Sequence, residues 1–213
     1  MSDKLYAMNV GSLVVGAFEV NCVILWDDAR RAVVVDPGAD AEDIERFLAD
    51  HQLTLTAIWL THGHIDHVSA LTDLLKVHPV STYIHKDEVE RTFSPRNRIP
   101  PYWTVPEKPS NLVFLHDGDV LSVGNETMTV LHTPGHGAGC VCYYSATDKL
   151  LLTGDTLFRG GVGRTDFASG DMGALQSSLA RLMTLPDDTR VIPGHGPQTT
   201  IQTEKISNPF LEH

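Results

Sequence analysis

The chain has 213 residues, 42% of them hydrophobic and 20% charged, and its formal net charge is −11 because 27 acidic residues outweigh 16 basic ones. This composition is that of a globular protein with a sizeable core, which excludes an intrinsically disordered chain. The acidic balance disfavours nucleic acid as a partner, since phosphate binding needs clustered Lys and Arg. Three cysteines are too few for a disulfide framework. Without a signal peptide or a membrane-spanning window, we expect a cytoplasmic protein with no membrane partner.

The first part of the chain alternates predicted strands and helices. Runs rich in Val, Ile and Leu predict strands at 21–26, 31–35, 55–60 and 80–84. Apolar residues at helical spacing predict helices at 40–50 and 69–77. The tripeptide Asp36-Pro37-Gly38 is interpreted as the turn that ends the second strand.

A proline-rich segment at 93–110 interrupts this alternation. It holds five prolines, with Tyr102 and Trp103 between them. Long irregular connections in compact domains are often functional, so these two aromatic residues are candidates for a lid or wall of a substrate site. Packing of the same aromatic rings onto the core is an equal alternative, and the role of the segment stays open.

The second part of the chain also consists of predicted strands and a predicted helix. The pattern predicts strands at 112–115, 120–123, 128–132, 141–144, 149–152 and 190–192, and a helix at 173–183. Strands outnumber helices, which favours two sheets sandwiched between helices. We expect one domain over 1–213 that is built from two halves of similar element order, about 1–110 and 111–213.

A cluster of metal-ligand residue types lies at 61–67, where the sequence is Thr-His-Gly-His-Ile-Asp-His. The cluster follows an apolar strand and precedes a predicted helix, so it occupies a strand-to-helix turn where side chains converge at a sheet edge. Imidazole and carboxylate groups are ligands that suit zinc, iron or manganese. The sequence therefore predicts a metal site built around His62, His64, Asp66 and His67.

Three further candidate ligands share this local pattern. His136, Asp155 and His195 each follow a predicted strand, and each has Gly or Pro beside it. Glycine lets the backbone approach a compact site closely. A single histidine after a strand is usually structural, but a cluster followed in order by His, Asp and His is a much more specific signal.

This ordered set, His-x-His-x-Asp-His and then His136, Asp155 and His195, resembles the metallo-β-lactamase superfamily over nearly the whole chain. The resemblance implies an α+β fold, a four-layered αβ/βα sandwich. It also implies two divalent metal ions, with zinc expected first and iron or manganese as alternatives. In that arrangement, one metal is held by His62, His64 and His136, the second is held by Asp66, His67 and His195, and Asp155 and a water or hydroxide bridge the two.

The chemistry of such a site agrees with this division. Two divalent ions held roughly 3.5–4 Å apart lower the pKa of a bridging water toward neutrality, and the resulting hydroxide attacks a carbonyl group. The same ions offset the charge of the tetrahedral intermediate. Asp155 as the bridge and Asp66, which could orient the nucleophile, are therefore the candidate catalytic residues.

Within the superfamily, the chain resembles glyoxalase II-type hydroxyacylglutathione hydrolases, and especially the short bacterial form without a C-terminal helical domain. The matching motifs are Thr-Pro-Gly-His at 133–136, Gly-Asp-Thr-Leu-Phe at 154–158, Gly-Val-Gly-Arg-Thr-Asp-Phe at 161–167, Pro-Gly-His-Gly-Pro at 193–197 and Asn-Pro-Phe-Leu at 208–211. The resemblance implies hydrolysis of a small thioester, such as the glutathione conjugate S-lactoylglutathione.

The residues for glutathione recognition match less well. Arg164 falls where the long enzymes carry a basic residue that contacts glutathione, although a surface ion pair is an alternative role. Thr165 and Asp166 stand where those enzymes have Phe-Tyr, and only 18 residues follow His195. We therefore expect the thioester chemistry but leave the carrier open.

Other functions compete with this interpretation. Persulfide dioxygenases share the fold and the Gly-Arg-Thr-Asp-Phe motif at 163–167. Resemblance to them implies a single iron, which His62, His136 and Asp155 would bind in this chain. The short length of the chain and the Asn-Pro-Phe sequence at 208–210 favour the hydrolase. A non-catalytic metal scaffold is a weaker alternative. A β-lactamase is weaker still, because β-lactamases usually offer a cysteine in place of Asp155. The remaining internal histidines are interpreted as structural: His51, His78, His85, His116 and His132. The sequence does not indicate an oligomeric state.

Overall fold

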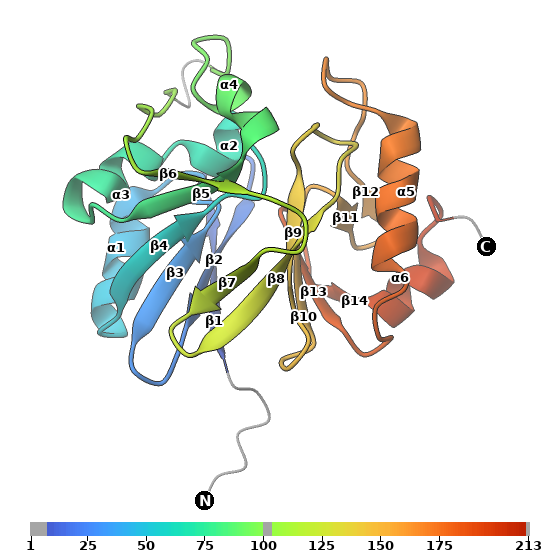
Figure 1. The fold of residues 1–213 in the computed structure, drawn as a ribbon, viewed down its shortest axis with the longest axis horizontal. Helices are drawn as coiled ribbons and strands as arrows, with labels where there is room; N and C mark the ends of the chain where they lie inside the picture. Colours follow the sequence, from blue (N-terminus) through green and yellow to red (C-terminus); the bar gives the residue numbers. More distant parts are fainter. Residues whose placement is uncertain (1–7, 100–103, 212–213) are drawn as a thin grey trace, which may run out of the picture.

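The chain forms two six-stranded sheets that pack face to face, with helices on their outer faces (Figure 1). The computed structural model describes residues 8–99 and 104–211. In spatial order, the first sheet consists of β1 (Asn9–Val15), β2 (Val20–Trp26), β3 (Arg31–Val35), β4 (Thr54–Trp59), β5 (Ser81–His85) and β6 (Leu112–Leu115). The second consists of β14 (Thr199–Thr200), β13 (Arg190–Pro193), β10 (Leu150–Gly154), β9 (Val141–Ser145), β8 (Glu126–His132) and β7 (Val120–Val123). A two-stranded hairpin joins β11 (Leu157–Phe158) to β12 (Gly161–Val162).

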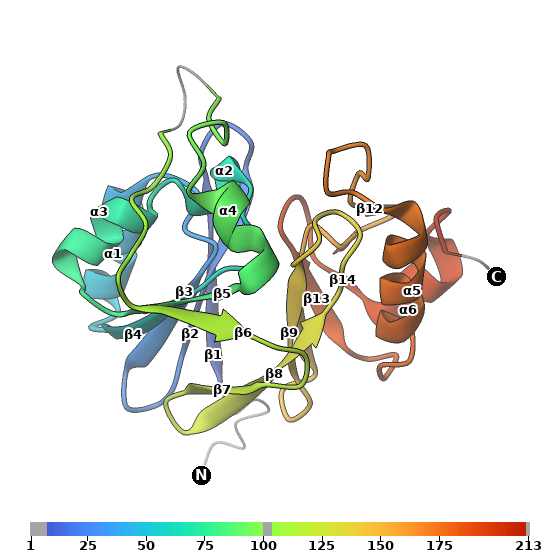
Figure 2. The ribbon, with the colours of Figure 1, turned by 45° about the horizontal axis from the view of Figure 1, so that its top comes forward.

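The helices complete four layers (Figure 2). The outer face of the first sheet is covered by α1 (Ala41–Asp50) and α3 (Leu71–Val77), and that of the second by α5 (Met172–Leu182) and α6 (Ile201–Ser207). The short helices α2 (Ile65–Val68), η1 (Lys86–Glu88) and α4 (Val89–Thr92) lie at one end of the first sheet. The predicted α+β, four-layered αβ/βα sandwich is confirmed. No helix in the described ranges is long and apolar enough to cross a bilayer.

Three apolar clusters hold the layers together. The central one lies between the sheets and includes the fully buried side chains of Trp59, Met128 and Tyr143. The outer clusters include Ile44 beneath α1 and Leu175 beneath α5. Full burial of such a side chain contributes about 1.5–3 kcal/mol. Strands buried on both faces read as continuous apolar runs, which is why the central strands were visible in the sequence.

Strand direction places the predicted ligands at one edge of the molecule. Strands β3, β4, β5 and β6 pair in parallel, so their carboxyl ends lie together. In the second sheet β10 is parallel to β13, and β8 runs in the same sense because both β8 and β10 are antiparallel to β9. The ends of β4, β8, β10 and β13, which lead into the predicted ligands, therefore converge.

The structure differs from the sequence-based prediction in several elements. The helix expected at 69–77 begins at Leu71, and the separate helix α2 precedes it. Strand β1 was missed because it is an edge strand that contains Gly11 and buries few side chains. Helix α6 was missed although Thr200 caps it by accepting the backbone N–H of Thr203. The chain passes to the second sheet only after β6, so residues 112–115, which we had placed in the second half, complete the first sheet.

Candidate metal centre

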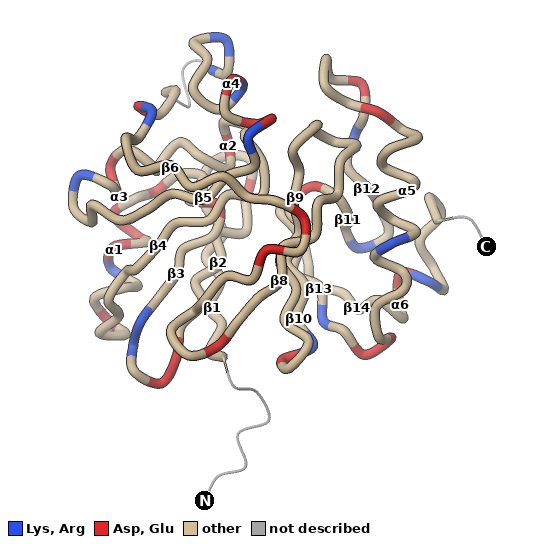
Figure 3. The backbone as a smooth tube through the Cα atoms, in the orientation of Figure 1, with Lys and Arg blue, Asp and Glu red and all other residues tan. Residues whose placement is uncertain are grey.

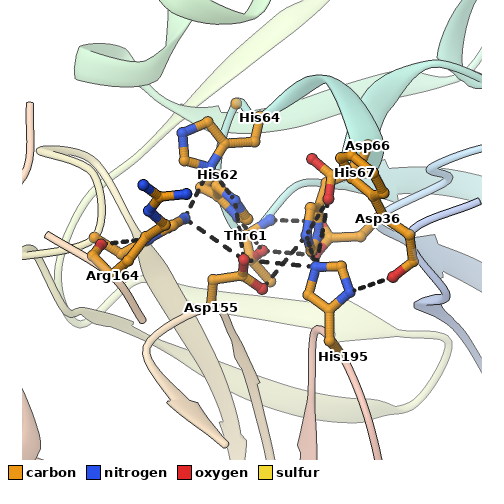
Figure 4. Close-up of polar contacts among 12 residues, drawn as sticks. Asp36, Thr61, His62, His64, Asp66, His67, Asp155, Arg164 and His195 are labelled. Atoms are coloured by element: carbon orange, nitrogen blue, oxygen red, sulfur yellow. Dashed lines mark hydrogen bonds and ion pairs between the residues drawn. The ribbon is translucent and has the colours of Figure 1, made fainter. Parts of the chain in front are cut away.

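The predicted cluster occupies the loop between β4 and α2. Strand β4 ends at Trp59, and α2 begins at Ile65 with His64 as its extended N-cap residue. This short connection directs His62 and His64 from the loop and Asp66 and His67 from the first turn of α2 toward a common space (Figure 4).

Four side chains form a first donor group, in which one ligand atom from each lies within 4.8 Å of the others: His62, His64, His136 and Asp155. The Nδ1 atom of His64 lies 3.0 Å from Nε2 of His62 and 2.7 Å from Nε2 of His136. Oδ2 of Asp155 lies 3.5 Å from Nε2 of His136. The loops after β4, β8 and β10 thus contribute jointly to one group.

A second donor group consists of Asp66, His67 and His195, again with ligand atoms within 4.8 Å of one another. Nε2 of His195 lies 3.2 Å from Nε2 of His67 and 3.4 Å from Oδ2 of Asp66. Asp155 stands between the two groups, because its Oδ1 lies 3.4 Å from Nε2 of His67. The structure therefore brings all seven predicted ligand residues together around two adjacent points.

The donor chemistry of both groups fits divalent cations. Nitrogen atoms of neighbouring imidazoles face each other at 2.7–3.2 Å. Oδ1 of Asp155 is buried and has no hydrogen-bond partner among the described residues. Buried polar atoms in folded proteins nearly always have partners, so convergent lone pairs without them indicate a cation site. Imidazole and carboxylate donors suit zinc, iron and manganese alike.

Electrostatics differ between the two groups. Burial, followed by the neighbouring imidazoles, lowers the pKa of His62 well below its ordinary value, which keeps its lone pair available. Burial alone would also lower the pKa of His67, but the charges of Asp155 and other nearby carboxylates outweigh burial and raise it. The space around His67, which faces Asp36, Asp66 and Asp155, therefore favours a positive charge.

Backbone carbonyls orient two of the histidines. Nδ1 of His136 lies 2.8 Å from the carbonyl oxygen of Arg164, and Nδ1 of His195 lies 2.8 Å from that of Phe18. Each carbonyl accepts the Nδ1–H, which leaves Nε2 free to face its donor group. Such outer contacts fix the tautomer of a ligating histidine.

A buried carboxylate that sequence reasoning missed lies beneath the site. Asp36 accepts hydrogen bonds from the backbone N–H of Thr61 at 2.7 Å and from its hydroxyl at 2.6 Å. Its Oδ2 also lies 3.0 Å from Nδ1 of His67. We had interpreted Asp36 only as part of a turn. The missed signal was an acid directly after a buried strand, which is the same pattern that identified Asp155.

A cavity of about 670 Å³ opens over the two donor groups. Among the predicted substrate contacts, Arg164 lines it, but its guanidinium is paired with Asp166 at 2.5 Å and lies over the ring of Phe167. Tyr102 and Trp103 lie outside the described residues.

The histidines interpreted as structural lie outside both donor groups. The ring of His51 stacks on Phe47, and His78 pairs with Glu45. His85 stacks on His132, with ring centroids 4.4 Å apart.

Comparison with known proteins extends this description. The family description of the metallo-beta-lactamase superfamily matches residues 15–195. Hydroxyacylglutathione hydrolase GloC of Haemophilus influenzae is 37% identical over 208 residues, which cover 96% of this chain and 98% of that protein. The crystal structure of BLEG-1 B3 metallo-beta-lactamase has a TM-score of 0.90 and 36% identity, covering 96% of this chain and all of that one. The crystal structure of TTHA1623 in a di-iron-bound form has a TM-score of 0.86 and 34% identity, covering 94% of this chain and all of that one.

Proposed function

Because this chain belongs to the metallo-β-lactamase superfamily of metal-dependent hydrolases, we propose that it hydrolyses thioesters, with hydroxyacylglutathione conjugates such as S-lactoylglutathione as the substrate class. The observation that carries the proposal is the position of Asp155. Its Oδ2 lies between the two donor groups, 3.5 Å from Nε2 of His136 and 3.6 Å from Nε2 of His195, and its Oδ1 lies 3.4 Å from Nε2 of His67. A carboxylate shared by two adjacent donor groups suits two ions held close together, as in a two-metal hydrolytic site.

The residues divide into two ligand sets that share Asp155. One metal would be held by His62, His64 and His136, and the other by Asp66, His67 and His195. When bound, such ions polarise a carbonyl oxygen and lower the pKa of water toward neutrality. Zinc is the first candidate. Iron and manganese are the alternatives, and the relative in a di-iron-bound form supports testing iron directly.

The lining of the cavity supports attack by water rather than by a side-chain nucleophile. No serine or cysteine lines the cavity within the described ranges. All three cysteines are buried, and burial raises the pKa of the Cys142 thiol to about 11. A thiol of this kind is protonated at neutral pH and is therefore a poor nucleophile.

Other residues of the chain would position the reactants. Asp66 lines the cavity, and its Oδ2 can orient a proton of the attacking water while it also faces His195 at 3.4 Å. Asp36 holds both Thr61, at the start of the loop before α2, and His67 in place from below. Phe167 lies against His64 and His136, with ring centroids 4.9 and 5.7 Å away, and shields that side of the site.

Thioester turnover by metal-loaded protein tests the proposal. We expect S-lactoylglutathione hydrolysis by protein loaded with zinc, iron or manganese, and we expect Asp155→Ala to abolish it while circular dichroism stays that of the folded chain. Asp188→Ala is the matched control, because Asp188 is an exposed aspartate that pairs with Lys149 far from the donor groups.

Two parallel assays separate the competing functions. Oxygen uptake with glutathione persulfide by the iron-loaded protein, without thioester turnover, would instead make the chain a mononuclear iron dioxygenase. Hydrolysis of a β-lactam without thioester turnover would instead make the chain a β-lactamase, like the B3 metallo-beta-lactamase to which it is similar. Either result would overturn the thioester proposal.

A further inference from the structure

The cavity over the metal centre carries a local excess of positive charge. Four of the 16 basic residues of the chain line it: Arg91, Arg96, Arg98 and Arg164. Within the described ranges, the carboxylates that line it are Asp66 and Asp155, and both belong to the donor groups. The surrounding chain has a net charge of −11. A cleft lined by one sign of charge concentrates ligands of the opposite sign.

Three of these arginines come from one segment, which includes α4 and the loop beyond it (Figure 3). The side-chain amide of Asn97 ties this loop to the metal centre by donating to the carbonyl oxygen of Gly63 at 2.7 Å and to that of Thr92 at 3.3 Å. Gly63 separates His62 from His64. The two arginines that flank Asn97, Arg96 and Arg98, are therefore held at the cavity beside the first donor group.

The arginines differ in how far their charges are already satisfied. Arg164 is paired with Asp166. Arg91 donates to the hydroxyl of Ser169, and its Nη1 lies 2.6 Å from Nε2 of His64. The guanidinium groups of Arg96 and Arg98 are exposed and make no hydrogen bond or ion pair with any side chain in the described ranges. Their donors are available to a ligand.

Two aromatic side chains line the cavity near His195. Phe18 and Phe158 are these lining residues. The carbonyl oxygen of Phe18 lies 2.8 Å from Nδ1 of His195, and the ring centroids of Phe158 and His195 lie 6.2 Å apart. Burying a carboxylate against these rings would be costly, whereas an arginine fork matches a carboxylate or phosphate with paired hydrogen bonds. The arginines therefore give the cavity an anion-accepting region, and Phe18 and Phe158 give it an apolar region beside His195.

We propose that Arg96 and Arg98, with Arg91 behind them, bind the anionic arm of the thiol carrier in the substrate, while the acyl group lies toward Phe18 and Phe158. This inference rests on the proposed thioester hydrolysis and extends it by assigning the carrier's charge and its orientation. Carboxylates and phosphates share the required chemistry, so the experiment must distinguish a glutathione carrier from a coenzyme A carrier.

The experiment compares three lactoyl thioesters whose carriers are glutathione, coenzyme A and the uncharged thiol N-acetylcysteamine. We expect Arg96→Gln combined with Arg98→Gln to raise KM for an anionic thioester about tenfold more than KM for the uncharged one, since the lost contacts are charge-assisted. The anionic thioester whose KM rises more identifies the arm, since glutathione carries carboxylates and coenzyme A carries phosphates. In the wild type, added salt should raise KM for the anionic substrates selectively.

The control removes two positive charges elsewhere. Arg46→Gln combined with Lys76→Gln changes exposed residues that pair with Asp43 and Asp73 on α1 and α3, and it should leave KM for every substrate as in the wild type. An equal effect of the Arg96 and Arg98 substitutions on all three substrates, or no effect, would overturn the inference. Equal effects of the control pair would do the same.

A binding measurement keeps the inference separate from the proposed reaction. S-methylglutathione is a thioether that cannot be hydrolysed, and its Kd can be measured by calorimetry even if no thioester is turned over. Weaker binding by the doubly substituted protein than by wild type and the control supports an anion site at Arg96 and Arg98. If wild type turns over the glutathione and coenzyme A thioesters but binds them without any contribution from these arginines, the inference fails while the proposed function stands.

Discussion

Nδ1 of His67 lies 3.0 Å from Oδ2 of Asp36, a carboxylate that is only 2% exposed. The contact leaves Nε2 of His67 directed at the second donor group, where it faces His195 at 3.2 Å. Asp36 is therefore the residue that sets the orientation and tautomer of a proposed ligand without being one of the seven predicted donors.

Asp36→Asn should weaken metal binding by about 10–100-fold, which is the usual effect of removing a carboxylate behind a ligating histidine. Asparagine tolerates the left-handed backbone of Asp36, at φ 52°, so the loop itself should persist. Competition with a fluorescent chelator measures the affinity, and Asp188→Asn serves as the exposed control. Unchanged affinity in Asp36→Asn would show that the contact with His67 does not act on the metal.

Glu88 should stabilise the fold by joining two loops of the centre. It is buried and accepts the backbone N–H of Gly63 at 3.0 Å and that of Gly139 at 2.9 Å. Glu88→Ala leaves both buried donors unpaired, so we expect the free energy of unfolding of the metal-free protein to fall by about 2–4 kcal/mol. Urea denaturation measures it. Glu90→Ala, an exposed glutamate of α4, should change it by less than about 0.5 kcal/mol, and equal losses in the two variants would contradict the assignment.

Two neighbouring glycines offer a test of close packing at Asp155. A Cβ atom on Gly163 would lie 1.9 Å from the backbone oxygen of Asp155, whereas one on Gly161 would have its nearest neighbour 3.8 Å away. Gly163→Ala should therefore lower the free energy of unfolding by about 1–3 kcal/mol and reduce activity, because the backbone beneath Asp155 must shift. Gly161→Ala should have little effect on either. Thermal denaturation and thioester assays of both proteins decide, and a tolerated Gly163→Ala would refute the packing argument.

Asp27 should make stability depend on pH in the acid range. Burial alone would raise the pKa of this carboxyl, but hydrogen bonds from the side chain and backbone of Arg31 outweigh burial and lower it. A depressed pKa contributes stability that is fully present above the unfolded value of about 3.9 and is lost as pH falls through the folded value. The gap in unfolding free energy between wild type and Asp27→Asn should be constant from neutral pH to about 5 and shrink below about 4. A gap independent of pH would contradict this.

The sequence predicted the sandwich and the donor residues because their signals are local. The donors follow apolar strands, and His136, Asp155 and His195 each stand beside glycine or proline, as His195 does in Pro-Gly-His-Gly. The convergence of four strand ends then follows from the parallel arrangement within each sheet. Neither step needs knowledge of how distant side chains meet.

The remaining features depend on contacts between distant segments, which periodicity does not report. Asp36 resembles any acid in a turn until Thr61 and His67 are folded over it. Arg96 and Arg98 resemble solvent-exposed charges until Asn97 ties their loop to Gly63, 34 residues earlier. The pairing of Arg164 with Asp166 was local, but the sequence could not decide between that ion pair and a substrate contact.

The most direct test of the two-metal hydrolase is a titration of metal-free protein with zinc, and in parallel with iron and manganese, while the rate of S-lactoylglutathione hydrolysis is followed. If His62, His64 and His136 hold one ion and Asp66, His67 and His195 a second, with Asp155 shared, the rate should rise to a plateau at two equivalents of metal per chain. A plateau at one equivalent, or no hydrolysis with any of the three metals, would contradict the account.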